Sequence, residues 1–572
     1  MNRITRALAL SLLPAVTVAQ APLPPDASFG PAAESELRDV VERFSLDLGA
    51  LQRRYPVEAS PERTARLKKL YGDWKARAAG LEFDRLGVEG RIDHVLLRSR
   101  IDYELRLLGR EELWRAEIRP LLPFADALLA LNDARMRMEK LDAAKAAQSL
   151  DRLASEIDAV RRGIETGTQK PARLAAFRAQ EDLLELKRAL DSWFAFYSGY
   201  DPTFTWWCAA PQKELVKAMD AYRASLREKV LGIKAGEEDP IVGTPIGREA
   251  LALDLRSEFI AYTPEELLQI ADREFAWCEA EMKKAAREMG LGDDWKAAVE
   301  RVKNLYVPPG EQPELIRFLA REAEDYVERH NLITVPPLAK EVWRMQMMTP
   351  ERQKVNPFFT GGETISVSYP TDTMDHSDKM MSMRGNNPHF ARATVFHELI
   401  PGHHLQGFMN ARYNAHRRAF RTPFWGEGWA LYWEMLLWDR GFQKSPENKI
   451  GMLFWRTHRA ARIIFSLRFH LGSMSPQECI DLLVDKVGHE RANAEAEVRR
   501  SFNGSYPPLY QLAYMMGGLQ FRALHKELVE TGKLTDRAFH DAVITGGSMP
   551  VEMVRARLTK QLLPKDHKAA WR

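Results

Sequence analysis

The most informative stretch of this sequence is His397-Glu398-Leu399-Ile400-Pro401-Gly402-His403-His404, because it contains candidate metal ligands. It places histidines and a carboxylate within about two helical turns, and Glu427 follows downstream in Gly426–Tyr432. Imidazole and carboxylate groups are the usual ligands of a catalytic zinc ion. We therefore predict a site for one Zn²⁺ ion with His397 and Glu427 as ligands. The common zinc motif H-E-x-x-H needs its second histidine at position 401, where this chain has proline.

The second histidine ligand is either His403 or His404. On a regular helix His404 lies about 20° from His397 and His403 about 120° away, which favours His404. Pro401 prevents a regular helix, because it lacks an N–H and its ring clashes with the carbonyl of residue 397. We expect a bulge or break here. A two-residue insertion would return His403 to the ligand position, so the geometry leaves both open.

Glu398 is the predicted general base. It directly follows the ligand His397 and can take a proton from a water whose pKa zinc lowers to about 7. The same carboxylate can then pass the proton to the leaving amine. Glu434 is the alternative to Glu427 as ligand, because seven residues place both on one helical face.

A resemblance to a known family favours particular residues as the second histidine ligand and the glutamate ligand. The pattern His-Glu-x-x-Pro-Gly-His-x-x-Gln resembles the signature of the bacterial domain of unknown function 885 family, and its matches here are His397, Glu398, Pro401, Gly402, His403 and Gln406. The resemblance implies His403 as the second ligand. The segment Glu427–Tyr432 is similar to the family's second motif, in which the glutamate resembles the third ligand of gluzincin metallopeptidases. Helical dipeptidyl peptidase III enzymes likewise have a lengthened motif.

The same resemblance implies further candidate site residues. Tyr514 and Gly517 match a Tyr-x-x-Gly element, and Arg462 and His470 resemble an Arg-…-Asp-x-Gly-x-His pattern. The chain departs from that pattern at two positions, where Ser466 and Arg468 replace the expected Asp and Gly. The candidate donors to the oxyanion of a transition state are, in order, Tyr514, His470 and Arg462.

Composition excludes several classes of protein. The 572 residues are 45% hydrophobic and 28% charged, with 82 basic and 79 acidic residues, which is typical of a globular protein and predicts no nucleic-acid partner. Cys208, Cys278 and Cys479 are far apart, which excludes a disulfide framework and a cysteine zinc site.

The N-terminus is predicted to be a signal peptide, residues 1–21, cleaved after residue 19 or 21. Arg3 and Arg6 precede the apolar stretch Ala7–Val18, which small residues follow. No cysteine follows the apolar stretch, so we expect no lipid anchor there. A secreted or periplasmic location follows, with no membrane span in the rest of the chain.

The remaining pattern predicts a mainly α fold with a small β element beside the active-site helix, and the resemblance implies a helical gluzincin-like metallopeptidase fold. Apolar residues recur at helical spacing over most of the chain, and residues 358–370 are typical of a turn and strand. We expect a helical N-terminal lobe over residues 22–345 and a catalytic lobe over residues 346–572, within one continuous family domain. The segment Glu363–Tyr369 could bind an extended peptide by edge pairing.

The predicted function is that of a zinc metallopeptidase acting on short peptides. One alternative is a zinc amidase acting on non-peptide amides, and another is a metal-binding or helical interaction protein without turnover. A non-haem iron enzyme is a further alternative, because two histidines and one carboxylate also suit Fe(II). Glu398 argues against the last two, since neither needs a base at that position. The oligomeric state is not predicted.

Overall fold

The computed structural model describes residues 34–234, 237, 240–356, 358–504 and 506–572. The predicted signal peptide, residues 1–21, lies outside the described residues. Among the described residues, no helix combines the length and the apolar character that a membrane crossing requires.

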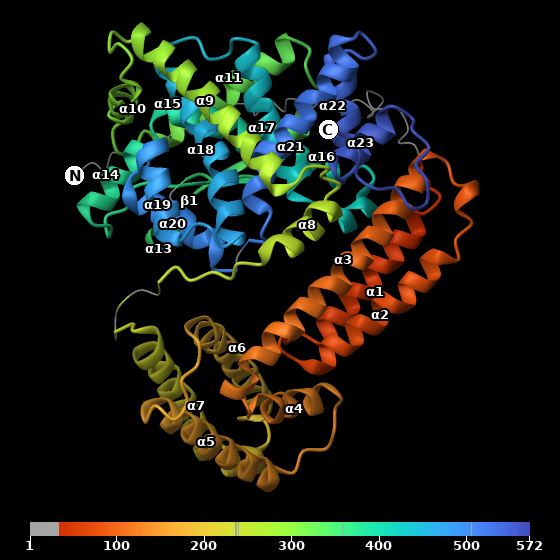
Figure 1. The fold of residues 1–572 in the computed structure, drawn as a ribbon, viewed down its shortest axis with the longest axis vertical. Helices are drawn as coiled ribbons and strands as arrows, with labels where there is room; N and C mark the ends of the chain where they lie inside the picture. The colour runs from red at the N-terminus through yellow and green to blue at the C-terminus, as the bar shows by residue number, and fades with distance from the viewer. Residues whose placement is uncertain (1–33, 235–236, 238–239, 357, 505) are drawn as a thin grey trace, which may run out of the picture.

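The fold is mainly α-helical, which confirms the predicted class (Figure 1). The first half of the chain contains α1 (Arg38–Arg54), α2 (Pro61–Ala79), α3 (Val88–Ile118), α4 (Ala125–Met136), α5 (Ala143–Glu165), α6 (Arg173–Tyr197), α7 (Pro202–Ser225), α8 (Gly247–Ser257), α9 (Pro264–Glu288), α10 (Trp295–Lys303), α11 (Gln312–Arg329) and α12 (Pro337–Val342). The second half contains α13 (Pro350–Val355), α14 (His376–Gly385), α15 (Pro388–Glu398), α16 (His403–Asn410), α17 (Pro423–Asp439), α18 (Pro446–His470), α19 (Pro476–Leu482), α20 (Arg491–Phe502), α21 (Tyr510–His525), α22 (Asp536–Thr545) and α23 (Val551–Leu558).

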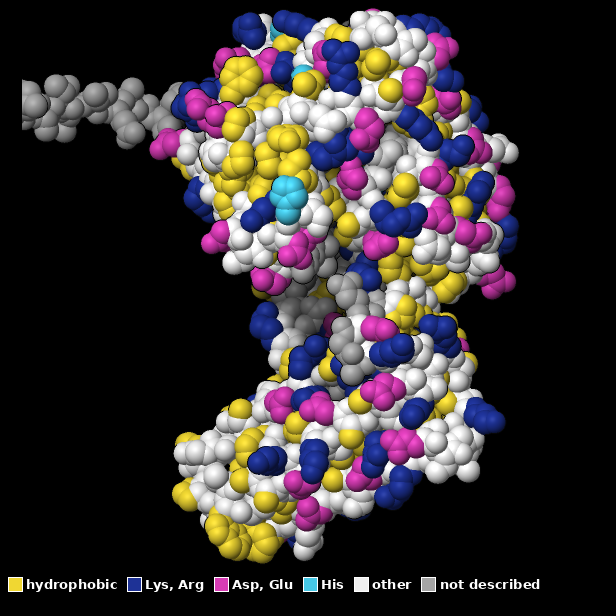
Figure 2. Space-filling model, turned by 90° about the vertical axis from the view of Figure 1, so that its left-hand side faces the viewer, with side chains coloured by type: hydrophobic (Ala, Val, Ile, Leu, Met, Phe, Trp, Pro, Cys, Tyr) yellow, Lys and Arg dark blue, Asp and Glu magenta, His cyan; other side chains and the backbone are white. Residues whose placement is uncertain are grey.

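The helices form a main body, which contains α8–α23, and a separate bundle of α4–α7, with the long helix α3 reaching from one to the other (Figure 1). The α4–α7 bundle has its own apolar core, in which Leu150, Leu153 and Ile157 of α5 are fully buried. Figure 2 shows basic and acidic side chains interspersed over the visible face of both parts. This face has no extended single-sign surface of the kind that binds a polyanion.

The predicted β element is a two-stranded parallel sheet, β1 (Arg344–Met347) and β2 (Thr364–Val367). On its other side, β2 pairs with Thr360, because the N–H of Thr360 donates to the carbonyl of Ser366 and the N–H of Ser366 donates to the carbonyl of Thr360. This bridge occupies the outer edge of β2 at Ser366, so the predicted pairing of a peptide along Glu363–Tyr369 would have to displace it. In the described part of the chain no strand pairs with the outer edge of β1, whose side chains are mostly exposed.

Helix α17 lies at the centre of the main body and packs closely on α21. A Cβ atom at Gly428 of α17 would lie 2.6 Å from the Cα atom of Gly517 on α21, and one at Gly517 would lie 2.2 Å from the carbonyl oxygen of Phe424. The two backbones therefore touch at these glycines. The predicted Tyr-x-x-Gly element thus has a packing role at Gly517.

We predict that Gly428→Ala destabilises the protein, because the added methyl group must push the α17 and α21 backbones apart. Overpacking of this kind costs roughly 1–3 kcal/mol. Gly426→Ala is the matched control on the same helix, since a Cβ atom there meets nothing within 4 Å. Urea unfolding of both variants tests this, and an equal unfolding midpoint for the two would contradict it.

Candidate metal centre

The predicted break in the motif lies between α15 and α16. Helix α15 begins at Pro388 with Asn387 as its N-cap and ends at Glu398, and α16 begins at His403. Between them the N–H of Gly402 donates to the carbonyl oxygen of Phe396 at 3.0 Å. A Cβ atom at position 402 would lie 1.9 Å from the carbonyl oxygen of His397, so only glycine allows this path. The detour turns the chain back on itself and returns a histidine to the side of His397.

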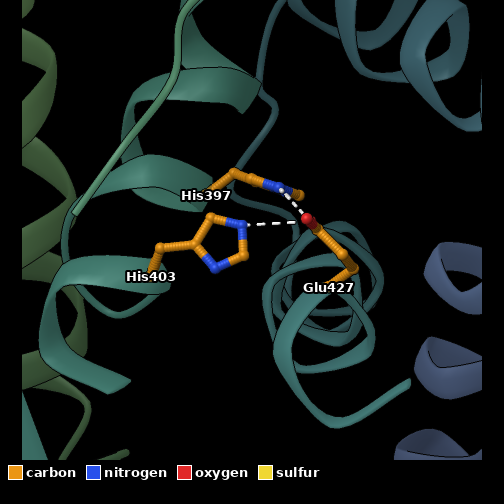
Figure 3. A group of neighbouring side chains, drawn as sticks. All are labelled: His397, His403 and Glu427. Atoms are coloured by element: carbon orange, nitrogen blue, oxygen red, sulfur yellow. Dashed lines mark hydrogen bonds and ion pairs between the residues drawn. The ribbon is translucent and has the colours of Figure 1, made fainter. Parts of the chain in front are cut away.

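His397, His403 and Glu427 converge in the structure (Figure 3). The Nε2 atom of His403 lies 3.1 Å from Oε2 of Glu427, and the Nε2 atom of His397 lies 3.7 Å from the same oxygen. One ligand atom of each residue lies within 4.8 Å of the others. His397 is buried, whereas His403 and Glu427 are partly exposed. The group can therefore be reached from solvent on the His403 side.

The chemistry of these three residues fits a divalent cation. Nδ1 of His397 donates to Oε1 of Glu434 at 2.6 Å, which leaves Nε2 of a neutral ring as an acceptor. That nitrogen faces a carboxylate oxygen of Glu427, so either a proton or a metal cation must lie between them. Ligands at 2.0–2.1 Å around a tetrahedral ion lie about 3.3 Å apart, close to the separations found here. Glu434 then has the role of the carboxylate that orients a metal-bound histidine.

The electrostatics of the group show how strongly it attracts positive charge. Burial opposes protonation of His397, yet the carboxylates of Glu427 and Glu434 raise the pKa of its ring to about 9. Burial alone would raise the pKa of Glu427, but His403 and His397 hold it well below its usual range. A divalent cation at this position can take the place of these protons.

His404 lies away from this group. Its Nε2 atom donates to the carbonyl oxygen of Ala339 at 2.7 Å, and burial lowers the pKa of the ring. The structure thus places His403 beside His397 and Glu427, although a regular helix would have favoured His404.

Glu398 is the last residue of α15, next to His397. A Cβ atom at Gly361 would lie 2.3 Å from Oε2 of Glu398, so the backbone just before β2 closes over this carboxylate. Burial raises the pKa of Glu398, and the nearby His397 and His403 oppose that rise. A carboxylate with a raised pKa in this position is suited to accept and return a proton.

Two tyrosines of α21 complete the surroundings. The ring of Tyr514 lies nearly parallel to that of His397, with centroids 6.3 Å apart. The hydroxyl of Tyr510 donates to Oε1 of Glu427, the oxygen that does not face the histidines. The sequence analysis missed Tyr510, although its position four residues before Tyr514 puts both on one helical face.

The other two predicted donors lie elsewhere. The guanidinium of Arg462 donates to Glu497 at 2.6 Å and lies over the Tyr514 ring. His470 is buried beside Phe469 and Phe502, and no contact within the described residues joins it to His397, His403 or Glu427. His470 is the last residue of the 25-residue helix α18. The spacing of residues in the sequence could not show what this end of the helix packs against.

A second group, His525, Asp536 and His540, also has metal-ligand spacing. Nδ1 of His540 donates to the carbonyl of Leu332, and Nε2 accepts from the hydroxyl of Tyr432. Asp536 accepts hydrogen bonds from His525 and from Arg440, the residue that follows the last residue of α17. Hydrogen bonds therefore account for this group without a metal.

Comparisons with known proteins extend these observations. The sequence profile of a family described as "Bacterial protein of unknown function (DUF885)" matches residues 44–558. No curated protein matches the chain. A solved structure of a "putative lipoprotein of unknown function" from Shewanella oneidensis has a TM-score of 0.68 at 18% identity, over 92% of this chain and 100% of that one. A "putative lipoprotein" from Colwellia psychrerythraea has a TM-score of 0.58 at 16% identity, over 88% and 91%. At these identities the likeness concerns the fold alone.

We predict that Gly402→Ala abolishes stoichiometric zinc binding. The methyl group would overlap the carbonyl oxygen of His397, so the detour must open and carry His403 away from Glu427. Gly407→Ala, in α16, is the matched control, because a Cβ atom there meets nothing within 4 Å. Zinc content after dialysis distinguishes the two, and a fully loaded Gly402→Ala protein would refute the proposed role of the detour.

We also predict that Glu434→Gln weakens zinc binding roughly 10- to 100-fold, since the ring of His397 loses the carboxylate that orients it. Asp439→Asn removes an exposed carboxylate from the end of the same helix and should leave the affinity unchanged. Competition with a chromophoric chelator measures both. Equal affinities for the two variants would show that Glu434 does not support the site.

Proposed function

We propose that this chain, which belongs to the bacterial protein family of unknown function DUF885, is a zinc-dependent hydrolase that cleaves short peptides. The observation that carries the proposal is the convergence of His397, His403 and Glu427, with the Glu434 carboxylate on the far nitrogen of His397. Two imidazoles and one carboxylate leave zinc a free position, as in catalytic rather than structural sites.

The roles of the surrounding residues follow from their positions. A bound zinc ion lowers the pKa of a water molecule and polarises a carbonyl group. Glu398 accepts the proton of the attacking water, because it is adjacent to His397 and lies under the backbone of Gly361 beside the group. The same carboxyl group returns the proton to the nitrogen of the leaving amine. Tyr510 holds Glu427 by its second oxygen and so fixes the carboxylate in place.

Tyr514 is the proposed donor to the oxyanion. Burial and the nearby Glu427 raise the pKa of its hydroxyl, so the proton stays available for donation. The guanidinium groups of Arg459 and Arg462 lie 4.7 and 4.3 Å from the centroid of its ring and hold that ring beside His397. A neutral hydroxyl held in this way can stabilise charge that develops in the transition state.

The proposal includes the location and the organisation of the chain. We place the protein in the periplasm or outside the cell, with residues 1–21 as signal peptide. The lipoprotein descriptions of two structural neighbours support an exported location. Residues 346–572 form the catalytic lobe, since they contain both histidines, Glu398 and Glu427, and residues 22–345 form the helical N-terminal lobe. The arrangement of a His-Glu pair on α15 and the third ligand on α17, with α16 between them, supports a gluzincin-like site.

We predict that Glu398→Gln abolishes peptide cleavage while zinc stays bound, because the amide cannot accept the proton. Cleavage of a mixed peptide library by the zinc-loaded wild-type protein, with a chelator-treated sample as control, supplies the reference activity. Zinc content is measured on the same samples. Wild-type-like turnover in the variant would exclude Glu398 as the base.

We predict that His403→Asn loses zinc and that the matched variant His404→Asn keeps it. The Nε2 atom of His404 is already bound to the carbonyl of Ala339, whereas that of His403 faces Glu427. Metal analysis after gel filtration reports both results. Loss of zinc from the His404 variant alone would reverse the assignment.

A further inference from the structure

A cavity of about 510 Å³ lies where the α4–α7 bundle meets the main body. Its walls come from α3, α6, residues 243–246, the end of α18 and the residues on both sides of the turn between α20 and α21. In Figure 1, α6 lies directly below the part of the main body that contains α20. A volume of this size accommodates a small ligand or a short stretch of peptide.

The cavity is linked to the candidate metal centre by two stacked rings. Tyr506 lines the cavity, and its ring lies parallel to that of Tyr510 with centroids 4.1 Å apart. Tyr510 in turn donates to Glu427. A molecule in the cavity therefore lies two side chains from a residue of the metal centre.

Each of the three arginines in the cavity wall has a carboxylate nearby, and that of Arg115 is Glu111 at 3.9 Å. The guanidinium groups of Arg110 and Arg178 lie 5.5 and 4.9 Å from the centroid of the Trp114 ring. Arg110 pairs with Asp254 at 3.5 Å, and Arg178 pairs with Glu117 at 2.6 Å. These pairs leave little positive charge to attract an anion, and Trp114 supplies an apolar surface between them.

The wall of the cavity also contains a partly buried carboxylate, that of Asp182. Burial raises the pKa of the Asp182 carboxyl to about 6, with Glu185 and Glu181 adding to the rise and Arg115 opposing it. Burial is the main cause of this rise, and Arg115 is the one neighbouring charge that opposes it among its causes. A cationic group placed beside it would favour the charged form.

His470, which the sequence analysis had assigned to catalysis, also lines this cavity and is 5% exposed. Burial lowers the pKa of its ring to about 4, so the ring is neutral, although the backbone of Thr244 opposes that shift. Among the described residues, its Nδ1 atom has no hydrogen-bond partner. A neutral ring that donates through one nitrogen accepts through the other, so Nδ1 needs an N–H donor.

We propose that this cavity binds an ammonium group of the substrate, with Asp182 as its counter-ion, His470 Nδ1 as a second acceptor and Trp114 against the adjoining apolar part. The inference rests on the proposed function, because the molecule in the cavity is taken to be the peptide that is cleaved. It names the class of substrate as peptides with a free amino terminus or a lysine side chain. His470 is in this account a binding residue, away from the reacting atoms.

Fluorescently labelled peptides test the proposal without turnover. Three versions of one sequence are used: a free amino terminus with norleucine, an acetylated terminus with lysine, and an acetylated terminus with norleucine. Their affinity for the zinc-loaded Glu398→Gln protein is measured by anisotropy, alone and combined with Asp182→Asn. Asp191→Asn, an exposed residue of the same helix, is the matched control.

Asp182→Asn should weaken the binding of at least one ammonium-bearing peptide about tenfold and leave the fully blocked peptide and the zinc content unchanged. Whichever ammonium peptide responds identifies the source of the amine. Equal affinities of the Asp182 variant and the Asp191 control for all three peptides would overturn the proposal, as would an equal loss for the blocked peptide. Binding that depends on Asp182 in a protein without peptidase activity would retain the cavity and reject the proposed function.

Discussion

Two carboxylates of one helix hold the ring of His397, one at each nitrogen. Glu427 and Glu434 lie seven residues apart on α17, so both project from the same face. Glu434 accepts from Nδ1, and Glu427 faces Nε2. The ring can neither flip nor change tautomer without losing a buried hydrogen bond. The rest of the centre depends on this arrangement, since it aims Nε2 at a carboxylate across a position that a proton or a metal cation can occupy.

Glycines allow the backbones around this arrangement to approach one another. At Gly402 the chain passes against the carbonyl of His397, which lets a six-residue spacing deliver His403 to the same place. At Gly428 and Gly517 the helices α17 and α21 touch, which brings Tyr510 and Tyr514 against Glu427 and His397. The Pro-Gly pair in the motif is therefore a structural requirement for the spacing of the two histidines.

The sequence predicted the helical class, the small β element and the break at Pro401, because periodicity and the missing N–H of proline are local properties. It also predicted the residues that converge, since the resemblance selected His403 over His404. It did not assign Tyr510 or the orienting role of Glu434, because both depend on how α17 packs against α15 and α21. The sequence also placed His470 among the groups near the metal, whereas in the structure its ring contacts Phe469 and Phe502, because spacing along α18 does not fix what a residue packs against. The bridge between Thr360 and Ser366, which lie only six residues apart, was not predicted either.

The central claim is that a zinc ion binds between His397, His403 and Glu427. A crystal structure of the zinc-loaded protein, with anomalous data on both sides of the zinc absorption edge, tests it most directly. The account predicts one anomalous peak, at about 2.0–2.2 Å from His397 Nε2, His403 Nε2 and Glu427. A peak at His525, Asp536 and His540 instead, or no peak in a protein that retains its fold, would contradict it.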